Sequence, residues 1–119
     1  MKLSDIVKRL VIDHRKLTHY ALDYDSPYGR HKAVLFEKVL GFTKENYESL
    51  VRQVEMNAPD TETVFHSEDR FGKRYAVDIE IEGNNGRRAI IRTGWLVSDN
   101  NNEAHLVTIY VKERETCRK

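Results

Sequence analysis

Residues 74–97 read RYAVDIEIEGNNGRRAIIRTGWLV, and this stretch decides the fold. Apolar side chains occupy alternate positions on both sides of the segment Gly83-Asn84-Asn85-Gly86. A period of two is typical of half-buried β-strands, and glycine and asparagine accept the positive φ angles of a tight turn. The stretch therefore predicts a β-hairpin with strands over about 74–81 and 88–97.

Two further strands are predicted around this hairpin. A short one covers Thr63–Phe65, and a last one covers His105–Lys112 after a turn at Asp99–Asn102. In the last strand, Val107, Ile109 and Val111 alternate with Leu106, Thr108 and Tyr110. Four strands joined by turn-like segments favour an antiparallel β-meander.

The chain before residue 61 has helical periodicity. Helices are predicted in two pieces over residues 4–22, capped by Ser4 and Asp13, and over Arg30–Leu40, ended by Gly41. Another helix is predicted from a cap at Thr43 to Pro59. The sequence therefore predicts an α+β fold, with N-terminal helices packed on one face of a C-terminal four-stranded antiparallel β-meander.

Length and composition indicate a single domain over residues 1–119, because 119 residues with 39% hydrophobic content support one core. Its helical part spans about 4–58, its sheet part about 61–112, and a frayed tail 113–119. The formal net charge of +1 does not mark the whole protein as nucleic-acid-binding, so such a role needs a local patch.

Cysteine usage and the N-terminal residues favour a cytoplasmic protein. Cys117 is the one cysteine, so no internal disulfide and no cysteine metal motif can form. The first residues lack an apolar run typical of a signal peptide or a membrane span. We expect no cofactor, no metal and no membrane partner, and the oligomeric state is left open.

The alternation also assigns the two faces of the predicted sheet. The face toward the helices is expected to carry Tyr75, Val77, Ile79, Ile81, Ala89, Ile91, Thr93, Trp95, Val97, Val107, Ile109 and Val111. The opposite face is expected to collect Arg74, Asp78, Glu80, Arg92, Thr108 and Tyr110. One face of an antiparallel sheet is often solvated, so polar residues there have either a purely solvating role or a functional one.

Two features favour a functional surface. Arg92, Thr108 and Tyr110 together offer a bidentate phosphate donor, a hydroxyl and a phenol, and Gly94 in mid-strand is typical of a bulge or of a ligand's close approach. His31 and Lys32 begin a helix, where backbone N–H groups favour an anion and histidine exchanges protons near neutral pH. An ordinary exposed helix start is the alternative for this pair.

Several spaced segments resemble one family of uncharacterised bacterial domains, whose members occur as small standalone proteins and at the C-termini of polymorphic toxins. The matching segments, in order, are Tyr20-Ala21-Leu22-Asp23, Ser26-Pro27, Gly29-Arg30-His31-Lys32-Ala33, Leu40-Gly41-Phe42-Thr43, Gly72-Lys73-Arg74-Tyr75-Ala76-Val77-Asp78, Gly83-Asn84-Asn85-Gly86, Arg92-Thr93-Gly94-Trp95 and Leu106-Val107-Thr108-Ile109-Tyr110-Val111. The resemblance spans roughly residues 12 to 112.

This resemblance implies a toxin-like domain similar to the barnase, EndoU, colicin and RelE group of ribonucleases, which cut RNA on an exposed sheet face without a metal. His31 would be the general base or acid, Arg92 the phosphate clamp, and Thr108 the group that orients the phosphate. Tyr110 would stack a base or relay a proton. The substrate-binding residues would be Lys32, Arg74 and Asp78, and a cognate antitoxin or immunity protein would be the partner.

Thr93 and Trp95 belong to the matched segments, yet alternation turns them toward the core, which predicts a structural role unless a bulge at Gly94 resets the register. The rival to the ribonuclease hypothesis is a non-catalytic binding module, either an antitoxin or immunity-type partner or an inactive toxin relative. A housekeeping domain with another ligand is the third alternative.

Overall fold

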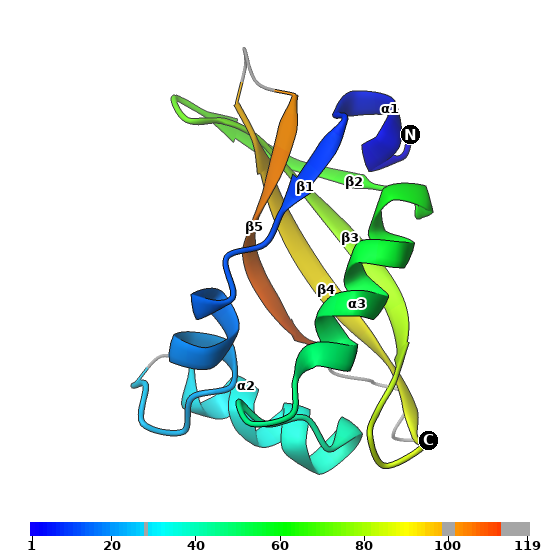
Figure 1. Ribbon diagram of the computed structural model, residues 1–119. Helices are drawn as coiled ribbons and strands as arrows, with labels where there is room; N and C mark the ends of the chain where they lie inside the picture. The colour runs from blue at the N-terminus through cyan, green and yellow to red at the C-terminus, as the bar shows by residue number, and fades with distance from the viewer. Residues whose placement is uncertain (28, 99–101, 113–119) are drawn as a thin grey trace, which may run out of the picture.

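The computed structural model describes residues 1–27, 29–98 and 102–112 (Figure 1). Its helices are α1 (Leu3–Ile6), η1 (Leu17–Ala21), α2 (Arg30–Leu35), η2 (Phe36–Leu40), α3 (Glu48–Asn57) and η3 (Ala58–Asp60). Its strands are β1 (Arg9–Val11), β2 (Val64–Asp69), β3 (Gly72–Glu82), β4 (Arg88–Val97) and β5 (Glu103–Val111). Of the predicted turn at Asp99–Asn102, only Asn102 is among the described residues. The predicted tail at 113–119, which includes Cys117, lies outside them.

The mixed α+β class is confirmed, but the sheet differs from the predicted one. Within the described part of the chain it has five strands, in the order β1-β5-β4-β3-β2. The four C-terminal strands pair antiparallel, as expected, whereas β1 pairs parallel with β5. The prediction of a purely antiparallel four-stranded meander was therefore wrong in strand number and in the type of one pairing.

Strand β1 lies inside the segment predicted to be helical. Leu10 pairs with Ala104, and the backbone N–H groups of Lys8 and Arg9 donate to the carbonyl of Asn102. Without β1, one edge of β5 would leave its backbone groups unpaired, which favours a partner strand. The preceding helix α1 is consequently only four residues long and begins at Leu3, before the predicted cap Ser4.

The other helical predictions are confirmed in type but not in every boundary. Arg30–Leu40 is continuous as α2 followed by the π-helical turn η2, and Gly41 ends it with a φ of 74°. Thr43 does not cap α3, because its hydroxyl accepts a bond from the N–H of Glu45 and the helix begins only at Glu48. No helix within the described ranges is long and apolar enough to cross a membrane.

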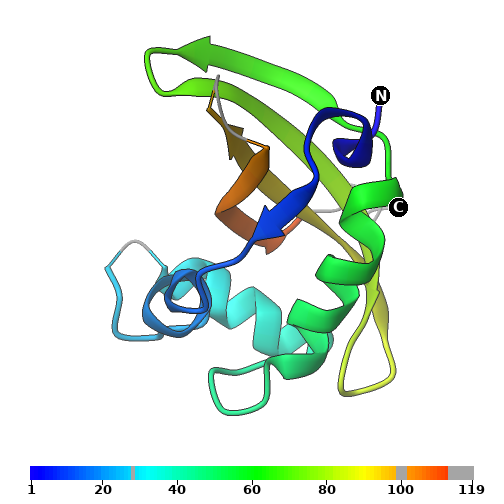
Figure 2. The same cartoon turned by 45° about the horizontal axis from the view of Figure 1, so that its top comes forward.

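The hydrophobic core lies between the sheet and the helices. Helix α3 crosses one face of the twisted sheet, and α2 with η2 lies against one end of it (Figures 1 and 2). All inward residues predicted on β3 and β4 are buried, including Thr93 and Trp95 at 0% exposure. The indole N–H of Trp95 donates to the Thr93 hydroxyl at 2.7 Å, and that hydroxyl donates to the Val77 carbonyl at 2.8 Å.

A β-bulge on β5 changes one predicted face assignment. Gly94 pairs with Thr108, whereas Trp95 pairs with Leu106, so Val107 is the extra residue. Leu106 consequently turns into the core, and Val107 does not, against the prediction from strict alternation. The irregularity lies opposite Gly94 rather than on its own strand, so Thr93 keeps its inward orientation.

The Gly83–Gly86 turn also caps the end of η2. The N–H of Asn84 donates to the Leu40 carbonyl at 2.8 Å, and the Asn85 amide donates to the Val39 carbonyl at 3.2 Å. A Cβ on Gly83 would lie 2.2 Å from the Leu40 carbonyl oxygen. Because the three nearest atoms all belong to the Leu40 backbone, this position excludes side chains by sterics rather than by backbone angle.

Gly83→Ala is therefore expected to destabilise the protein more than Gly86→Ala. Gly86 has a φ of 84° with nothing near its absent side chain, so alanine there adds about 1 kcal/mol of backbone strain. Alanine at Gly83 must separate the turn from η2, at about 2–3 kcal/mol. Urea unfolding of both variants measures the difference, and equal losses would contradict the role of the turn in packing against η2.

Candidate functional site

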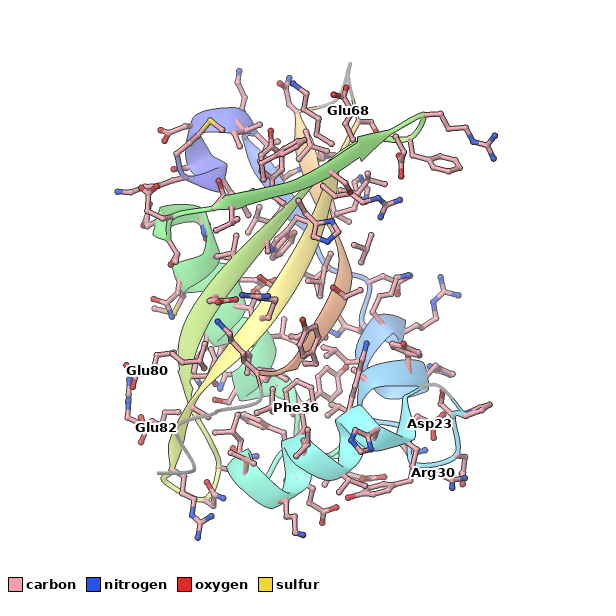
Figure 3. All side chains as sticks on the ribbon, turned by 180° about the vertical axis from the view of Figure 1, so that it is seen from behind. Asp23, Arg30, Phe36, Glu68, Glu80 and Glu82 are labelled. Carbon is pink, nitrogen blue, oxygen red and sulfur yellow. The ribbon has the colours of Figure 1, made fainter. Side chains whose placement is uncertain are left out.

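One row of polar side chains crosses three strands on the face away from α3. Asp78 on β3 pairs with Arg92 on β4, and Arg92 pairs with Tyr110 on β5. Directly opposed residues on neighbouring strands share a face, with side chains in contact. The register thus brings together three of the residues that the sequence placed on the polar face. Figure 3 shows the molecule from this side, with α3 behind the sheet.

Asp78 holds the guanidinium of Arg92 in a bidentate contact. Nε and Nη2 of Arg92 donate to the two carboxylate oxygens at 2.7 and 2.9 Å, and Lys112 Nζ donates to the same carboxylate at 2.9 Å. Hydrogen bonding from Arg92 first, and then from Lys112, lowers the pKa of Asp78 below its ordinary value of 3.8. The same contact with Asp78 raises the pKa of Arg92, so its charge is permanent.

This geometry changes how Asp78 can take part in binding. Both of its oxygens already bind cations of the protein, and a carboxylate would repel a phosphate. Arg92 retains N–H donors on Nη1 because a guanidinium carries five of them in a fixed fork. Asp78 thus orients Arg92, whose Nη1 donors take no part in the contact with Asp78.

A second row, next to the first, has small side chains. Ala76 pairs with Gly94, and Gly94 pairs with Thr108. A Cβ on Gly94 would lie 2.4 Å from Thr108 Oγ1, so the hydroxyl occupies the space that the glycine leaves. Flanked by longer side chains, these small residues form the floor of a hollow.

We call this hollow the sheet groove. Its volume is about 360 Å³. It is lined by His66, Arg74, Tyr75, Ala76, Arg92, Gly94, Trp95, Val107, Thr108 and Tyr110. The predicted site residues Arg74, Arg92, Thr108 and Tyr110 therefore line one hollow. In it, Arg74 also donates to Asp69 at 3.0 Å, which partly neutralises its charge.

Of the predicted pair on α2, Lys32 reaches the site and His31 does not line it. Lys32 Nζ donates to the Tyr20 hydroxyl at 3.2 Å and lies 4.6 Å from the centre of the Tyr20 ring and 5.4 Å from that of Tyr110. It therefore stands at the rim nearest the helices. His31 is exposed, and the structure as described gives it no side-chain hydrogen bond or ion pair.

His66 is the groove residue that sequence reasoning passed over. It stands between Phe65 and Ser67, at the register shift between β2 and β3, and so belongs to a bulge that turns its ring toward the hollow. Its Nδ1 lies 3.0 Å from the Ser67 hydroxyl. The sequence predicted only a short strand ending at Phe65, and a bulge has no local pattern by which His66 could have been assigned to this face.

Among the described residues, the side chains that could bind a metal are not grouped together. In the ranges 1–27, 29–98 and 102–112, no three His, Cys, Asp or Glu side chains are grouped closely enough to hold an ion. The polar groups of the sheet groove are instead cations, hydroxyls and one imidazole. The chemistry of such a set suits an anion such as a phosphate, and it offers groups that donate and accept protons.

Comparison with known protein families shows to which family the chain belongs. The family described as a domain of unknown function (DUF6883) matches residues 2–113. The chain belongs to this family. The expectation that it is a member of an uncharacterised domain family is thus confirmed, whereas its link to ribonucleases stays a prediction.

A solved structure shares the fold of this DUF6883 domain. It is a chain from the contact-dependent growth inhibition toxin–immunity protein complex of Klebsiella pneumoniae 342, with a TM-score of 0.68 at 14% sequence identity. The alignment covers 87% of the present chain and 94% of that chain. At this identity the likeness establishes a common fold. No curated protein matches the chain.

Asp78→Asn is expected to lower stability at neutral pH and to lose this effect in acid. The folded-state pKa of Asp78 is depressed, so its contribution is present above pH 4–5 and disappears as pH falls through the folded-state value. Because the pair is partly solvated, we expect a loss of about 1 kcal/mol at pH 7. Urea unfolding at pH 7 and near pH 2 measures it.

The matched control is Asp60→Asn, which removes an exposed carboxylate with no side-chain partner among the residues that the structure describes. It should leave stability unchanged at both pH values. A loss at Asp78 that persists undiminished near pH 2 would contradict the assignment to its ionised form.

Proposed function

We propose that this domain is a metal-independent endoribonuclease that cleaves cellular RNA in the sheet groove and acts as the toxin of a toxin–antitoxin or toxin–immunity pair. The observation that carries the proposal is the convergence of Arg92, Thr108, Tyr110 and His66 on one groove. Support also comes from the fold shared with a chain of a growth inhibition toxin–immunity complex. Its site of action would be the cytoplasm, where its RNA substrate is.

The proposed reaction is an internal transesterification. A base removes the proton of the ribose 2′-OH, and the 2′-oxygen attacks the adjacent phosphorus. The bond to the 5′-oxygen breaks, and an acid donates a proton to that oxygen. The products are a 2′,3′-cyclic phosphate and a 5′-OH end. This chemistry needs a proton acceptor, a proton donor and a cation beside the phosphate, and no metal.

The cation of this reaction would be Arg92. Its guanidinium is held at Nε and Nη2 by Asp78, so the remaining donors face a fixed direction. Preorganised donors stabilise developing charge because they need no reorientation during the reaction. The Thr108 hydroxyl over Gly94 would donate to a second phosphate oxygen, and Lys32 at the rim would add a further positive charge.

Two histidines compete for the proton transfer. His31 is the candidate from the family resemblance, and it would act from helix α2. His66 lines the groove itself, and the Ser67 hydroxyl near its Nδ1 leaves Nε2 for the substrate. We assign the principal role to His66, with the Tyr110 phenol as the second proton-transfer group, because both share the groove with Arg92.

His66→Ala and Arg92→Ala are each expected to lower RNA cleavage by about 10²–10³-fold. The measurement is cleavage of total RNA by purified protein in the presence of a chelator, with the ends tested for 2′,3′-cyclic phosphate. His31→Ala, assayed alongside, decides between the two histidines. His14→Ala is the control, because His14 contacts Tyr47 and does not line the groove.

Wild-type protein that cuts no RNA would contradict the proposed activity. Cleavage that survives His66→Ala but fails in His31→Ala would return the proton-transfer role to His31. In cells, the inactive variants should relieve growth arrest upon induced expression. Circular dichroism should show them folded, since both side chains lie on the solvent-facing side of the sheet.

A non-catalytic, immunity-type binding module is the second candidate. The observation that favours it is the apolar surface of β2 and the β2–β3 turn, where Val64, Phe65 and Phe71 are 65%, 55% and 55% exposed. Exposed aromatic residues on an edge strand are typical of a protein interface. Under this alternative the protein would express freely, and His66→Ala would have no effect on growth.

A further inference from the structure

A second hollow adjoins the sheet groove. We call it the helix groove, and its volume is about 530 Å³. It is lined by Asp13, Arg15, Lys16, His19, Tyr20, Val107 and Thr108. Val107 and Thr108, the residues of the β5 bulge, line both hollows. The two grooves therefore lie next to each other at the bulge.

Lys32 connects the two hollows on the helix side. Its ammonium lies between the ring of Tyr20, which lines the helix groove, and the ring of Tyr110, which lines the sheet groove. Two aromatic rings, with a cation near both, therefore lie along the line from one groove to the other. Aromatic rings stack with bases of any sequence, and lysine neutralises phosphates.

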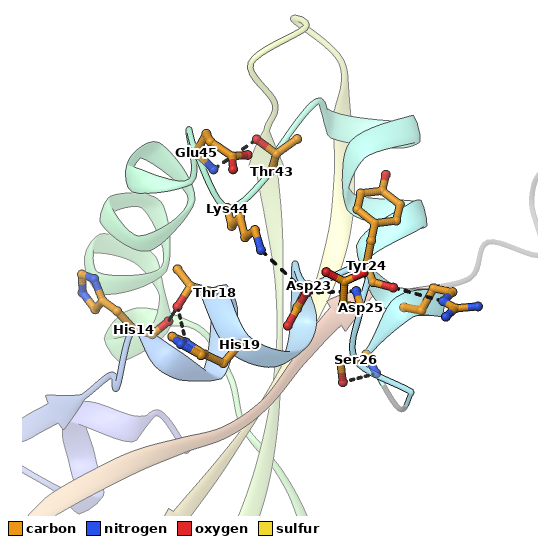
Figure 4. Close-up of polar contacts among 12 residues, drawn as sticks. His14, Thr18, His19, Asp23, Tyr24, Asp25, Ser26, Thr43, Lys44 and Glu45 are labelled. Carbon is orange, nitrogen blue, oxygen red and sulfur yellow. Dashed lines mark hydrogen bonds and ion pairs between the residues drawn. The ribbon is translucent and has the colours of Figure 1, made fainter.

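The helix groove has an excess of positive charge. Its single carboxylate, Asp13, accepts from Nε and Nη2 of Arg15 at 3.2 and 3.0 Å, and this contact lowers its pKa to about 2. Arg15 and Asp13 thus cancel, which leaves Lys16 as the uncompensated charge. Lys16 has no ion-pair partner within the described residues. His19, whose Nδ1 lies 2.9 Å from the Thr18 hydroxyl, adds a polar ring (Figure 4).

This charge is local rather than general. The whole chain has a formal net charge of only +1, yet Lys16, Lys32 and the Arg92–Asp78–Lys112 cluster, in which two cations share one carboxylate, follow one another along the two grooves. A row of cations attracts the phosphates of a nucleic-acid backbone. The rest of the protein is close to neutral and does not attract that backbone to other surfaces. The two grooves supply the local patch that a nucleic-acid role requires.

We propose that the substrate is single-stranded RNA that extends from the sheet groove across the Val107–Thr108 bulge into the helix groove. The scissile phosphate lies at Arg92, and flanking nucleotides stack on Tyr110 and Tyr20 and contact Lys16 with a phosphate. Stacking on these rings needs unpaired bases, which a duplex does not present. The inference rests on the proposed ribonuclease function and adds the form and the path of its substrate.

The test compares an RNA dinucleotide, which fills only the sheet groove, with a decanucleotide, which reaches the helix groove. Wild type should have a higher kcat/KM for the decanucleotide. In Lys16→Ala, the ratio of kcat/KM for the decanucleotide over that for the dinucleotide should fall by about fivefold, with a shallower salt dependence. Lys38→Ala on η2 is the matched control and should keep the wild-type ratio.

A binding assay with a 2′-O-methyl decanucleotide, which cannot be cleaved, gives an independent measure. Single-stranded RNA should bind more tightly than its duplex, and Lys16→Ala should weaken only the single-stranded form. An unchanged ratio in Lys16→Ala, or tighter binding of the duplex, would overturn the proposed path. Cleavage of the dinucleotide would still support the proposed ribonuclease function. Wild type that cleaves neither RNA overturns the function and the path together.

Discussion

The buried indole of Trp95 imposes the constraint on which the sheet depends. A fully buried indole N–H lowers the stability of the fold unless an acceptor binds it. The acceptor here is the hydroxyl of Thr93, which lies on the same face of the same strand. Thr93 in turn donates to the Val77 carbonyl on β3, so the contact also ties the two strands in one register. A slip by one residue would expose Trp95 and bury Arg92.

That register has a direct consequence for the opposite face. With Thr93 and Trp95 inward, Arg92 and Gly94 must point outward, beside Asp78 and Ala76 on one side and Tyr110 and Thr108 on the other. A row of long polar side chains thus stands next to a row of small ones, and this difference in side-chain length creates the sheet groove. The hollow is a consequence of packing on the other side of the same strands.

Periodicity predicted the parts of the structure that depend only on strict alternation. It placed every inward residue of β3 and β4, and it placed Arg74, Asp78, Arg92, Thr108 and Tyr110 on the polar face, because strands in a continuous ladder keep their period. It failed where pairing partners are distant. Arg9–Val11 forms a strand by pairing with β5, which is distant in sequence, and Val107 and His66 lie at bulges that their neighbours in sequence do not specify.

The same two bulges position the parts of the candidate site that could not be predicted from the sequence. The extra residue on β2 turns an imidazole toward the groove, and the extra residue on β5 leaves both Val107 and Thr108 on the outer face, where they line two hollows. Bulges interrupt the ladder at a cost in pairing, so they persist where another requirement outweighs regularity. Here both irregularities flank one surface, while the core side of β3 and β4 remains regular. Because both bulges place side chains along one outer surface, that surface is where the structure gives the strongest reason to look for function.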